Sequence, residues 1–476
     1  RDQPFDPGRG GTMSAAGVLI VGGGLAAQRC AQTLRKQGFE DPVRMVSAES
    51  VIPYDRPPLS KKFLTEGAAG LDIDLKPEAW YSDNGIGLLL GRRAAGLDPE
   101  AHRLSLDDGT ILDYDKLLIA CGSKARKLPA LAGFENVHYL RTASDSLRLG
   151  DELGNGAHLA LIGSGFIGQE VAATARTLGD EVTIVEAMAS PLEHILGAEV
   201  GDQIGSMHRD KGTDLMTRAM VETAKGNGRV EELVLADGRR IACDTVVVGI
   251  GVQPAADWLQ GSGLETDGVL TDTGARTRIP DVFAAGDVTR SLDPRTGTYS
   301  RSEHWDSAVR QGRAAAMSML GKPAPKVNLP SFWSDQFDSR IQYVGHAEIS
   351  DRVEIEGRPE DGAFTANYLR GDRLVAVLTV DQPRVIAAAG RIIEETHQEA
   401  QSRKATKMTC RALIDPNSCS GHGDCVDVAP SVFRLDDDIA EVIGDGPVEL
   451  LMEAAEACPA AAVQIIDNDT NEQIYP

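Results

Sequence analysis

The sequence predicts a multidomain α/β protein, because one pattern of strand, glycine-rich turn, helix and strand occurs twice and a cysteine cluster follows near the C-terminus. The two glycine-rich turns begin at Gly22 and Gly163, about 140 residues apart in a chain of 476 residues. A chain of this length is expected to hold three or four domains, each with its own core. The order of the patterns gives the expected order of these domains.

The first pattern begins with the apolar run Val18 to Val21, which predicts a buried strand. A helical pattern then continues to about Lys36, and a second apolar run, 43–46, predicts the next strand shortly before Glu49. The fingerprint positions of the turn between them carry Gly22, Gly24 and Ala27. Helix amides at such a turn can bind a pyrophosphate, and a carboxylate placed like Glu49 can accept a ribose hydroxyl. The pattern predicts a Rossmann-like dinucleotide-binding domain, although such glycine turns also serve packing alone.

The second pattern repeats every part of the first. Strands are predicted over 159–162 and 182–185, a helix over 167–178, and Glu186 at the end of the second strand. The fingerprint glycines are Gly163, Gly165 and Gly168. Two complete copies rarely arise by chance, so both are predicted to bind dinucleotides. Glu186 favours NADH over NADPH, because a carboxylate accepts hydrogen bonds from a free 2′-hydroxyl and repels a 2′-phosphate.

Five further motifs resemble those of the FAD-dependent ferredoxin reductases that serve bacterial oxygenases, a family with the glutathione-reductase type of structure. The motifs are 53–61 (PYDRPPLSK), Glu170 directly after the second fingerprint, 282–287 (VFAAGD), 303–305 (EHW) and 332–336 (FWSDQ). The resemblance spans roughly residues 18–393. It implies FAD at the first fingerprint, NADH at the second, and an α+β interface domain after them.

The resemblance also implies roles for individual residues around the FAD. It places Arg56 near the pyrophosphate, Lys61 beside the flavin ring with Glu170 facing it, Asp287 with Gly286 at the ribityl chain, and Trp305 at the pyrimidine end of the flavin. Physical chemistry supports the Lys61–Glu170 pair, since the cation could stabilise reduced flavin and the two charges can be buried together at lower cost than singly. Each of these residues also has a simpler interpretation. Lys61 could be a surface lysine and Glu170 a glutamate on the face of a helix. Asp287 could be a turn residue, and Trp305 and Trp333 could be core aromatics.

The chain departs from the family pattern at two positions. Cys121 stands where these reductases usually carry threonine, a change expected to alter packing more than chemistry. Ser190 replaces an arginine that is common near the adenosine end. His194, His208 and His304 lack metal-ligand spacing and are expected at the surface or in packing.

The cysteines of the reductase part exclude a related class of enzyme. Disulfide reductases of this fold use a close cysteine pair beside the flavin, whereas Cys30, Cys121 and Cys243 are widely spaced and are expected to be structural. Electrons must therefore leave the flavin by another route.

The C-terminal cysteines are spaced as ligands of an iron–sulfur cluster. Cys419 and Cys425 lie six residues apart, and Cys458, followed by proline, returns to the same cluster. Bacterial ferredoxins carry a further cysteine midway in this loop, where this chain has His422. Three thiolates favour a 3Fe-4S cluster, whereas a 4Fe-4S cluster would need His422 as fourth ligand. The alternatives are a zinc site or inert packing. A zinc site fits poorly, because zinc ligands usually come in close pairs on each side.

Residues 410–466 resemble the single-cluster ferredoxins that feed cytochrome P-450 monooxygenases, which implies a small α+β ferredoxin-like iron–sulfur domain. From Cys410 to the end, 14 Asp and Glu stand against Arg411 and Arg434, which is about half of the net charge of −23. This concentration of negative charge creates an electrostatic field that attracts basic partners and repels nucleic acid. It predicts a docking surface for an oxygenase with a basic face, and the alternative is an acidic face that is merely solvated.

The expected organisation follows from these motifs. It is a flexible extension over 1–12, the FAD domain over 13–122 and 249–322, the NADH domain over 123–248, the interface domain over 323–393, a linker of partly helical composition over 394–407 and the ferredoxin domain over 408–476. Seven cysteines, no signal peptide and no long apolar span predict a cytoplasmic protein that does not enter a membrane.

These features predict a self-contained electron-transfer protein. Electrons are expected to pass from NADH to FAD, because flavin converts a two-electron donor into one-electron steps, then to the cluster and to an external acceptor. A cytochrome P-450 monooxygenase is the favoured acceptor. The alternatives are a non-haem oxygenase, a biosynthetic iron–sulfur enzyme, or a different function as a flavin and iron–sulfur redox sensor.

Overall fold

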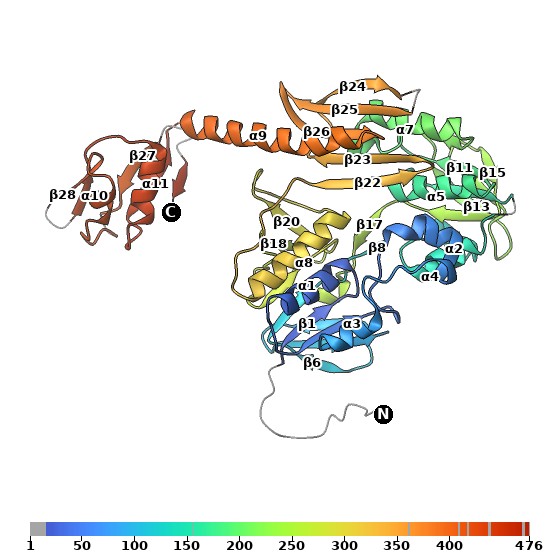
Figure 1. The fold of residues 1–476 in the computed structure, drawn as a ribbon, viewed down its shortest axis with the longest axis horizontal. Helices are drawn as coiled ribbons and strands as arrows, with labels where there is room; N and C mark the ends of the chain where they lie inside the picture. The colour runs from blue at the N-terminus through green and yellow to red at the C-terminus, as the bar shows by residue number, and fades with distance from the viewer. Residues whose placement is uncertain are drawn as a thin grey trace, which may run out of the picture. The chain divides into compact units, whose positions relative to one another are not determined.

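The computed structural model describes residues 16–154, 156–359, 362–407, 410–416, 418–436, 439–468 and 472–475, without the side chains of 397–407. The extension expected over 1–12 lies outside the described residues, as do Asp437 and Asp438. The chain divides into two compact units, Arg1–Gly390 and Arg391–Pro476, and each is described by itself (Figure 1).

The first sheet of the larger unit is parallel and has the strand order β19-β7-β1-β2-β3. Its strands are β1 (Val18–Val21), β2 (Val43–Ser47), β3 (Ile86–Leu90), β7 (Lys116–Ile119) and β19 (Val282–Ala284). Strand β19 follows the second fingerprint in sequence but pairs with β7, so two separate segments build one sheet. The strand predicted at Val18 to Val21 is confirmed as β1, and the helix predicted to end near Lys36 is α1 (Leu25–Lys36).

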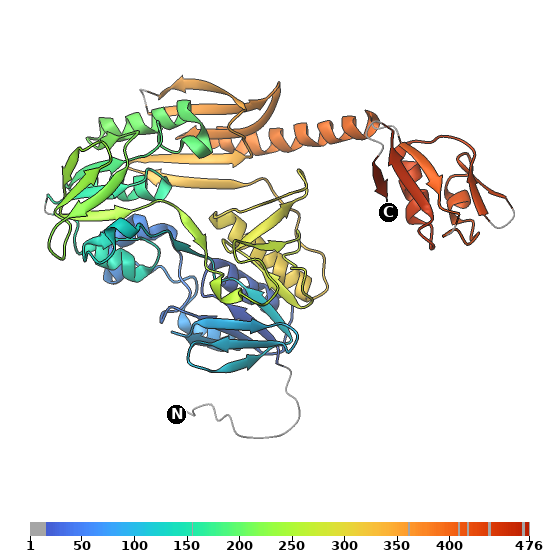
Figure 2. The ribbon, with the colours of Figure 1, turned by 180° about the vertical axis from the view of Figure 1, so that it is seen from behind.

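Each face of this sheet is covered. Helix α1 and helix α8 (Trp305–Met319) lie side by side on one face, as Figures 1 and 2 both show, and share a core with it. A Cβ on Gly312 of α8 would lie 2.3 Å from the Ala26 carbonyl oxygen, so glycine permits this close approach. The opposite face packs against a small antiparallel sheet of β4 (Ala94–Asp98), β5 (Arg103–Leu106) and β6 (Ile111–Asp113).

The second sheet repeats the arrangement, with strand order β12-β11-β10-β16-β9 and parallel pairing throughout. Its strands are β9 (Val137–His138), β10 (His158–Ile162), β11 (Glu181–Val185), β12 (Asp214–Met216) and β16 (Thr245–Val248), and helix α5 (Phe166–Thr177) follows β10. Central β10 lies between β11 and β16 as β1 lies between β2 and β7, so the repeated sequence pattern folds into a repeated domain. The predicted strands 159–162 and 182–185 are confirmed within one residue.

Smaller elements complete these two domains. A three-stranded antiparallel sheet belongs to the second domain, and β8 (Ser123–Ala125) pairs with β17 (Val252–Pro254) where the chain enters and leaves that domain. The remaining strands are β13 (Val221–Lys225), β14 (Glu232–Leu235), β15 (Arg240–Ala242), β18 (Val269–Thr271), β20 (Thr289–Asp293) and β21 (Thr298–Ser300). The remaining helices are α2 (Lys62–Gly70), α3 (Glu78–Asp83), α4 (Ala143–Gly150), α6 (Glu193–Leu196) and α7 (Ala198–Asp210).

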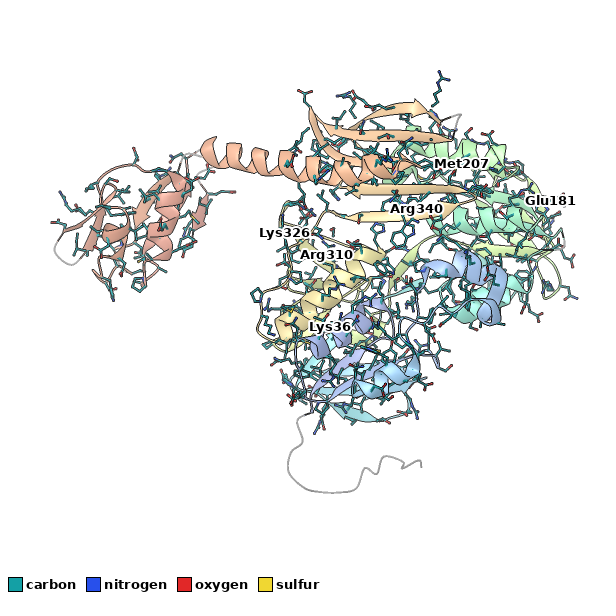
Figure 3. All side chains as sticks on the ribbon, in the orientation of Figure 1. Lys36, Glu181, Met207, Arg310, Lys326 and Arg340 are labelled. Atoms are coloured by element: carbon teal, nitrogen blue, oxygen red, sulfur yellow. The ribbon has the colours of Figure 1, made fainter. Side chains whose placement is uncertain are left out.

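A third domain is built on an antiparallel sheet of order β22-β23-β26-β25-β24. Its strands are β22 (Ser331–Gln336), β23 (Ser339–Gly345), β24 (Arg352–Arg358), β25 (Ala363–Arg370) and β26 (Arg373–Val380). Leu192, Leu196 and Val200 of the second domain pack into its core. Arg340, labelled in Figure 3, lies over the Trp333 ring of β22, 5.6 Å from the ring centroid. Helix α9 (Pro383–Lys407) follows and includes the segment expected as a linker, 394–407.

The smaller unit has its own hydrophobic core. Strands β27 (Cys410–Ile414), β30 (Val463–Asp467) and β31 (Gln473–Tyr475) form one antiparallel sheet, and β28 (Phe433–Asp436) with β29 (Ile439–Val442) forms a hairpin. Helices α10 (Asp424–Val428) and α11 (Val448–Glu456) complete the unit. Cys410 and Cys425 are buried in its core. Among the helices of the described residues, none has the length and apolar character needed to span a membrane.

Thermal stability should fall as the pH drops below about 6.5, because His208 on α7 is buried against β22. Burial lowers the pKa of His208, although its hydrogen bond with Gln336 acts in the opposite direction. Between the ordinary and the lowered pKa, His208 is protonated in the unfolded chain and neutral in the folded chain. The contribution of His208 to the free energy of unfolding is therefore fully present above the ordinary histidine pKa and declines as the pH falls from that value to the lowered one. Melting curves at about pH 7.5 and about pH 5.5 test this. A His208→Gln variant, which cannot be protonated, should lose less stability over the same interval.

Candidate functional site

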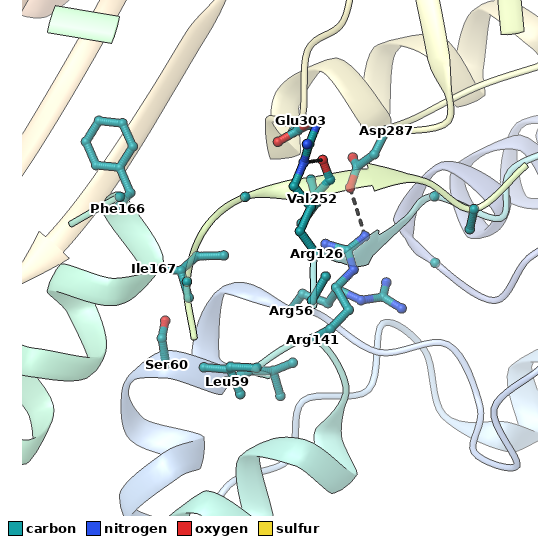
Figure 4. Close-up of a pocket in the computed structure, with 18 of the residues that line it drawn as sticks. Arg56, Leu59, Ser60, Arg126, Arg141, Phe166, Ile167, Val252, Asp287 and Glu303 are labelled. Atoms are coloured by element: carbon teal, nitrogen blue, oxygen red, sulfur yellow. Dashed lines mark hydrogen bonds and ion pairs between the residues drawn. The ribbon is translucent and has the colours of Figure 1, made fainter. Parts of the chain in front are cut away.

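One cleft of about 1300 Å³ in the larger unit runs past both glycine-rich turns. Lys61, Asp287 and Trp305 line it together with the two fingerprints, so the structure gathers the residues that the sequence singled out. Figure 4 shows Arg56, Arg141, Asp287 and Glu303 around one part of this cleft.

The first turn leaves room for a phosphate. Gly22 has φ +129°, and a Cβ there would lie 2.1 Å from the Ala120 carbonyl oxygen, so only glycine fits. Gly24 is the N-cap of α1, and Ala27 is fully buried behind it. The first turn of α1 carries neither an acidic residue nor a side-chain cap, so its amides are available to an anion.

Arg56 extends along this turn. Its Nη2 donates to Glu49 Oε1 over 2.9 Å, and the Tyr54 hydroxyl donates to Glu49 Oε2 over 2.6 Å. A Cβ on Gly24 would lie 3.0 Å from Arg56 Nη1. Arg56 Nε is buried and has no hydrogen-bond partner among the described residues. A buried donor without a partner beside helix amides fits the pyrophosphate of a dinucleotide.

The second turn is also built around glycine. A Cβ on Gly163, which has φ +96°, would lie 2.5 Å from the Gly249 carbonyl oxygen, and a Cβ on Gly168 would lie 2.6 Å from the Gly163 carbonyl oxygen. Gly165 is the N-cap of α5. Glu186 Oε2 accepts from the Ser164 amide (2.8 Å) and hydroxyl (2.5 Å), and Oε1 accepts from the Met188 amide (2.7 Å). These bonds fix the carboxylate at the end of β11, where it lines the cleft.

Replacing Glu186 with glutamine should raise the KM for NADH by roughly tenfold, because the charge-assisted hydrogen bonds available to a ribose are lost. It should also reduce the preference for NADH over NADPH, since the repulsion of a 2′-phosphate disappears. Steady-state kinetics with both nucleotides measure this. Glu181→Gln is the matched control, because Glu181 is the exposed first residue of β11 and Glu186 directly follows the last residue of that strand.

Asp287 is held by residues that are distant in sequence. Arg141 Nη2 donates to Asp287 Oδ2 over 2.8 Å, and the Ser123 hydroxyl donates to the same oxygen over 2.9 Å. Burial alone would raise the pKa of Asp287, but Arg141 and Ser123 outweigh it and keep the pKa below the ordinary aspartate value. Asp287 is therefore ionised in the cleft, and Gly286, with φ +84°, provides the turn before it.

Lys61 and Glu170 form an ion pair in the same cleft. Lys61 Nζ lies 2.8 Å from Glu170 Oε2, and the two side chains are 20% and 8% exposed. The Ser60 hydroxyl donates to Oε2 over 2.5 Å and the Ser334 hydroxyl to Oε1 over 2.7 Å. The alternative of a surface lysine and an unrelated helix-face glutamate is thus contradicted by the geometry.

Aromatic side chains form one wall of the cleft. Trp305 Nε1 donates to Asp55 Oδ1 over 2.8 Å, and its ring lies 6.0 Å from that of Trp333 in a T-shaped contact. His304 stacks on Phe332 with ring centroids 4.7 Å apart. All four rings line the cleft, so they are available to a planar ligand.

The two departures from the family pattern have different surroundings. Cys121 lines the cleft, and its thiol donates to the Ala255 carbonyl over 3.2 Å. Burial raises the pKa of Cys121 to about 11, so it is a thiol at neutral pH. Ser190 is buried away from the cleft lining and donates to Asp202 over 2.7 Å. His194 lies at the exposed edge of the cleft.

Three of the four cysteines of the smaller unit surround a second, much smaller cavity of about 20 Å³. Its lining includes Cys419, His422, Cys425 and Cys458. Burial, followed by the neighbouring Cys458 and Cys419, raises the pKa of the Cys425 thiol.

Backbone amides already point at two of these sulfurs. The Ala440 amide donates to Cys419 Sγ and the Ala462 amide to Cys458 Sγ, each over 3.4 Å. Amide donors of this kind stabilise the charge of cluster thiolates, so the residues fit an iron–sulfur cluster. Within the described residues no three ligand groups stand at the spacing of a single metal ion. His422 Nδ1 lies 2.9 Å from the Ser420 hydroxyl.

Sequence reasoning missed Ser60, Ser123, Arg141 and Ser334 as residues of the site. Ser60 and Ser334 lie within the motifs 53–61 and 332–336, but the motifs do not indicate their partners. Each of the four residues reaches its partner from a segment far away in sequence.

Comparisons with protein families match three segments of the chain. Residues 16–312 match the pyridine nucleotide-disulphide oxidoreductase family, residues 331–414 the reductase C-terminal family, and residues 414–465 the 4Fe-4S single cluster domain of ferredoxin I. The first match alone covers more than half of the chain.

Individual relatives agree with these family matches. The chain is 39% identical over 388 residues to the ferredoxin–NAD(+) reductase component of the anthranilate 1,2-dioxygenase system of Burkholderia cepacia, which covers 80% of this chain and 95% of the relative. It is 33% identical to putidaredoxin reductase of Pseudomonas putida over 79% of this chain and 92% of that protein. The crystal structure of the covalent putidaredoxin reductase–putidaredoxin complex matches with a TM-score of 0.76 and 32% identity, over 80% of this chain and 93% of that chain.

The B. cepacia relative is almost fully matched while a fifth of this chain is not, and residues 414–465 carry the single-cluster match. The chain therefore belongs to the pyridine nucleotide-disulphide oxidoreductase family, as an NADH-dependent FAD ferredoxin reductase with a ferredoxin-type iron–sulfur domain fused at its C-terminal side.

Proposed function

We propose that this chain delivers electrons from NADH to an external cytochrome P-450 monooxygenase through its own FAD and cluster. The observation that carries the proposal is the combination, in one chain, of a reductase without a close cysteine pair and a set of three thiols around one cavity. FAD supplies the conversion of a hydride into single electrons, and the cluster carries them one at a time. The resemblance of residues 410–466 to the single-cluster ferredoxins that feed cytochrome P-450 monooxygenases supports a P-450 as acceptor.

In this proposal the residues of the larger unit hold and orient the two nucleotides. The first glycine turn and Arg56 bind the FAD pyrophosphate, Glu49 the ribose, and Asp287 the ribityl chain. Trp305 lies against the flavin. Lys61, held by Glu170, places a positive charge next to it. The second turn and Glu186 bind NADH.

We propose a 3Fe-4S cluster held by Cys419, Cys425 and Cys458. Three thiolates satisfy three iron atoms, and His422 is then not a ligand. The match to a 4Fe-4S domain family supports the alternative, in which His422 binds a fourth iron. Electron paramagnetic resonance at low temperature, with an iron count, separates them. A signal in the oxidised protein that disappears on reduction by NADH indicates 3Fe-4S, and a silent oxidised state that gains a signal indicates 4Fe-4S.

The acceptor is tested by reconstitution. NADH oxidation should be coupled to product formation by a P-450 with a basic docking face, and the rate should fall as ionic strength rises, because the ferredoxin domain is strongly acidic. Coupling to a non-haem oxygenase instead would contradict a P-450 as acceptor. It would favour a dioxygenase, the kind of system to which the B. cepacia relative belongs. Slow turnover with every one-electron acceptor would favour a redox sensor. The cysteine content supports a cytoplasmic location.

A further inference from the structure

A chain of buried hydrogen bonds connects the third domain to Glu170. Ser334 and Gln336 lie on the same face of β22, and both are 0% exposed. Ser334 Oγ is 2.7 Å from Glu170 Oε1, and Gln336 Nε2 is 3.1 Å from Ser334 Oγ. His208 of the second domain, 1% exposed, places Nε2 2.9 Å from Gln336 Oε1.

The direction of these bonds follows from the chemistry of the groups. An ionised Glu170 can only accept, so the Ser334 hydroxyl donates to it and accepts from the Gln336 amide. The Gln336 carbonyl oxygen then faces His208, which must donate from Nε2. His208 Nδ1 is consequently the unprotonated nitrogen, and in the described part of the chain it is buried without a hydrogen-bond partner. Every bond in the chain therefore points towards Glu170.

The two carboxylate oxygens of Glu170 are fixed from opposite sides. Oε1 is held by the third domain through Ser334, and Oε2 is held by Ser60 and Lys61. Rotation of the carboxylate would break bonds on both sides at once. Since hydrogen bonds to a charged group are roughly twice as strong as neutral ones, this arrangement restricts where the Lys61 ammonium can lie.

We infer that Ser334 and Gln336 are positioning residues for Lys61, acting through Glu170 to fix the Lys61 ammonium in the cofactor cleft. The inference rests on the proposed function, in which Lys61 assists the bound flavin. It gives the third domain a part in setting the properties of the FAD site, in addition to the aromatic rings that it places in the cleft.

The test compares two deletions of a buried hydroxyl in the same sheet. Ser334→Ala removes the donor to Glu170, whereas Thr379→Val removes a fully buried hydroxyl on β26 that has no hydrogen-bond partner among the described residues. In stopped-flow measurements at saturating NADH, Ser334→Ala should slow reduction of the bound FAD about tenfold, with KM for NADH changed by less than about twofold. Thr379→Val should change the rate by less than about twofold.

A double-mutant cycle and a measurement of the flavin midpoint potential test whether Ser334 acts through Lys61. In a Lys61→Met background, Ser334→Ala should have no further effect on the rate, because the group that it positions is gone. The midpoint potential of the bound FAD should shift in the same direction with Ser334→Ala as with Lys61→Met, but by less. Gln336→Glu, which keeps the size and replaces the donor amide by an acceptor, should act in the same direction as Ser334→Ala.

Equal fold losses from Ser334→Ala in both backgrounds, or a potential unchanged by Ser334→Ala, would overturn the inference while leaving the role of Lys61 intact. A rate that Lys61→Met does not alter would reject the proposed role of Lys61 itself, and with it any role for Ser334 that depends on that lysine.

Discussion

The Cys458→Ala variant should lose most of its iron and should no longer reduce the external acceptor. Cys458 is one of three thiols around the small cavity, so its removal leaves two thiolates for a cluster that needs at least three protein ligands. Mutation of a group that only orients a metal ligand typically lowers metal affinity or activity by about 10- to 100-fold, so loss of the ligand itself should lower them more. Iron and sulfide content, together with NADH-driven reduction of the acceptor protein, measure the effect.

The same variant should keep its reductase activity. NADH-driven reduction of a small one-electron oxidant such as ferricyanide requires only the larger unit, which has its own core and cleft. Cys410→Ala is the matched control, since Cys410 is buried in the core of the same unit but does not line the cavity. Full iron content in Cys458→Ala would exclude Cys458 as a ligand. Loss of iron with undiminished acceptor reduction would show that electrons leave the flavin directly.

The two dinucleotide-binding domains could be predicted because their sequence signals are local. A buried strand, a turn that only glycine can make, and a helix that starts without a cap are all encoded within about 20 residues, as at Gly22 and Gly163. The positions of Glu49 and Glu186, the carboxylates that follow, could also be predicted, because each comes shortly after the second strand of its pattern. The predicted fold class is accordingly confirmed, including both dinucleotide-binding domains and the small iron–sulfur domain.

The supporting residues could not be predicted, because nothing in the local sequence indicates their partners. Arg141 reaches Asp287 across 146 positions of the chain, and Ser334 reaches Glu170 across 164. A lone serine or arginine is usually a surface residue, so only the folded arrangement reveals these contacts. His208 illustrates the same limit, since its sequence context allowed either a surface or a packing role and the structure buries it.

The Lys61→Met variant should reduce its FAD with NADH roughly 100-fold more slowly, because loss of a fixed charge at a site of developing negative charge typically costs about this much. FAD should remain bound, since the glycine turn, Arg56 and Asp287 hold other parts of the cofactor in the proposed function. Stopped-flow absorbance of the flavin gives the rate, and the ratio of visible to ultraviolet absorbance gives the FAD content. Lys62→Met, an exposed neighbour, is the matched control.

A second substitution separates the chemical role of Lys61 from its structural one. Lys61→Met leaves Glu170 buried without its cation, and breaking a buried ion pair in this way costs about 3–5 kcal/mol. The double variant Lys61→Met/Glu170→Gln removes the uncompensated charge and should recover most of the stability, but the slow reduction of the flavin should persist. Recovery of both would mean that the pair only maintains the fold. Loss of FAD from Lys61→Met would place the lysine in cofactor binding instead. Recovery of stability without recovery of rate is therefore the result that assigns Lys61 to the reaction, because the uncompensated charge has been removed while the lysine ammonium is still absent.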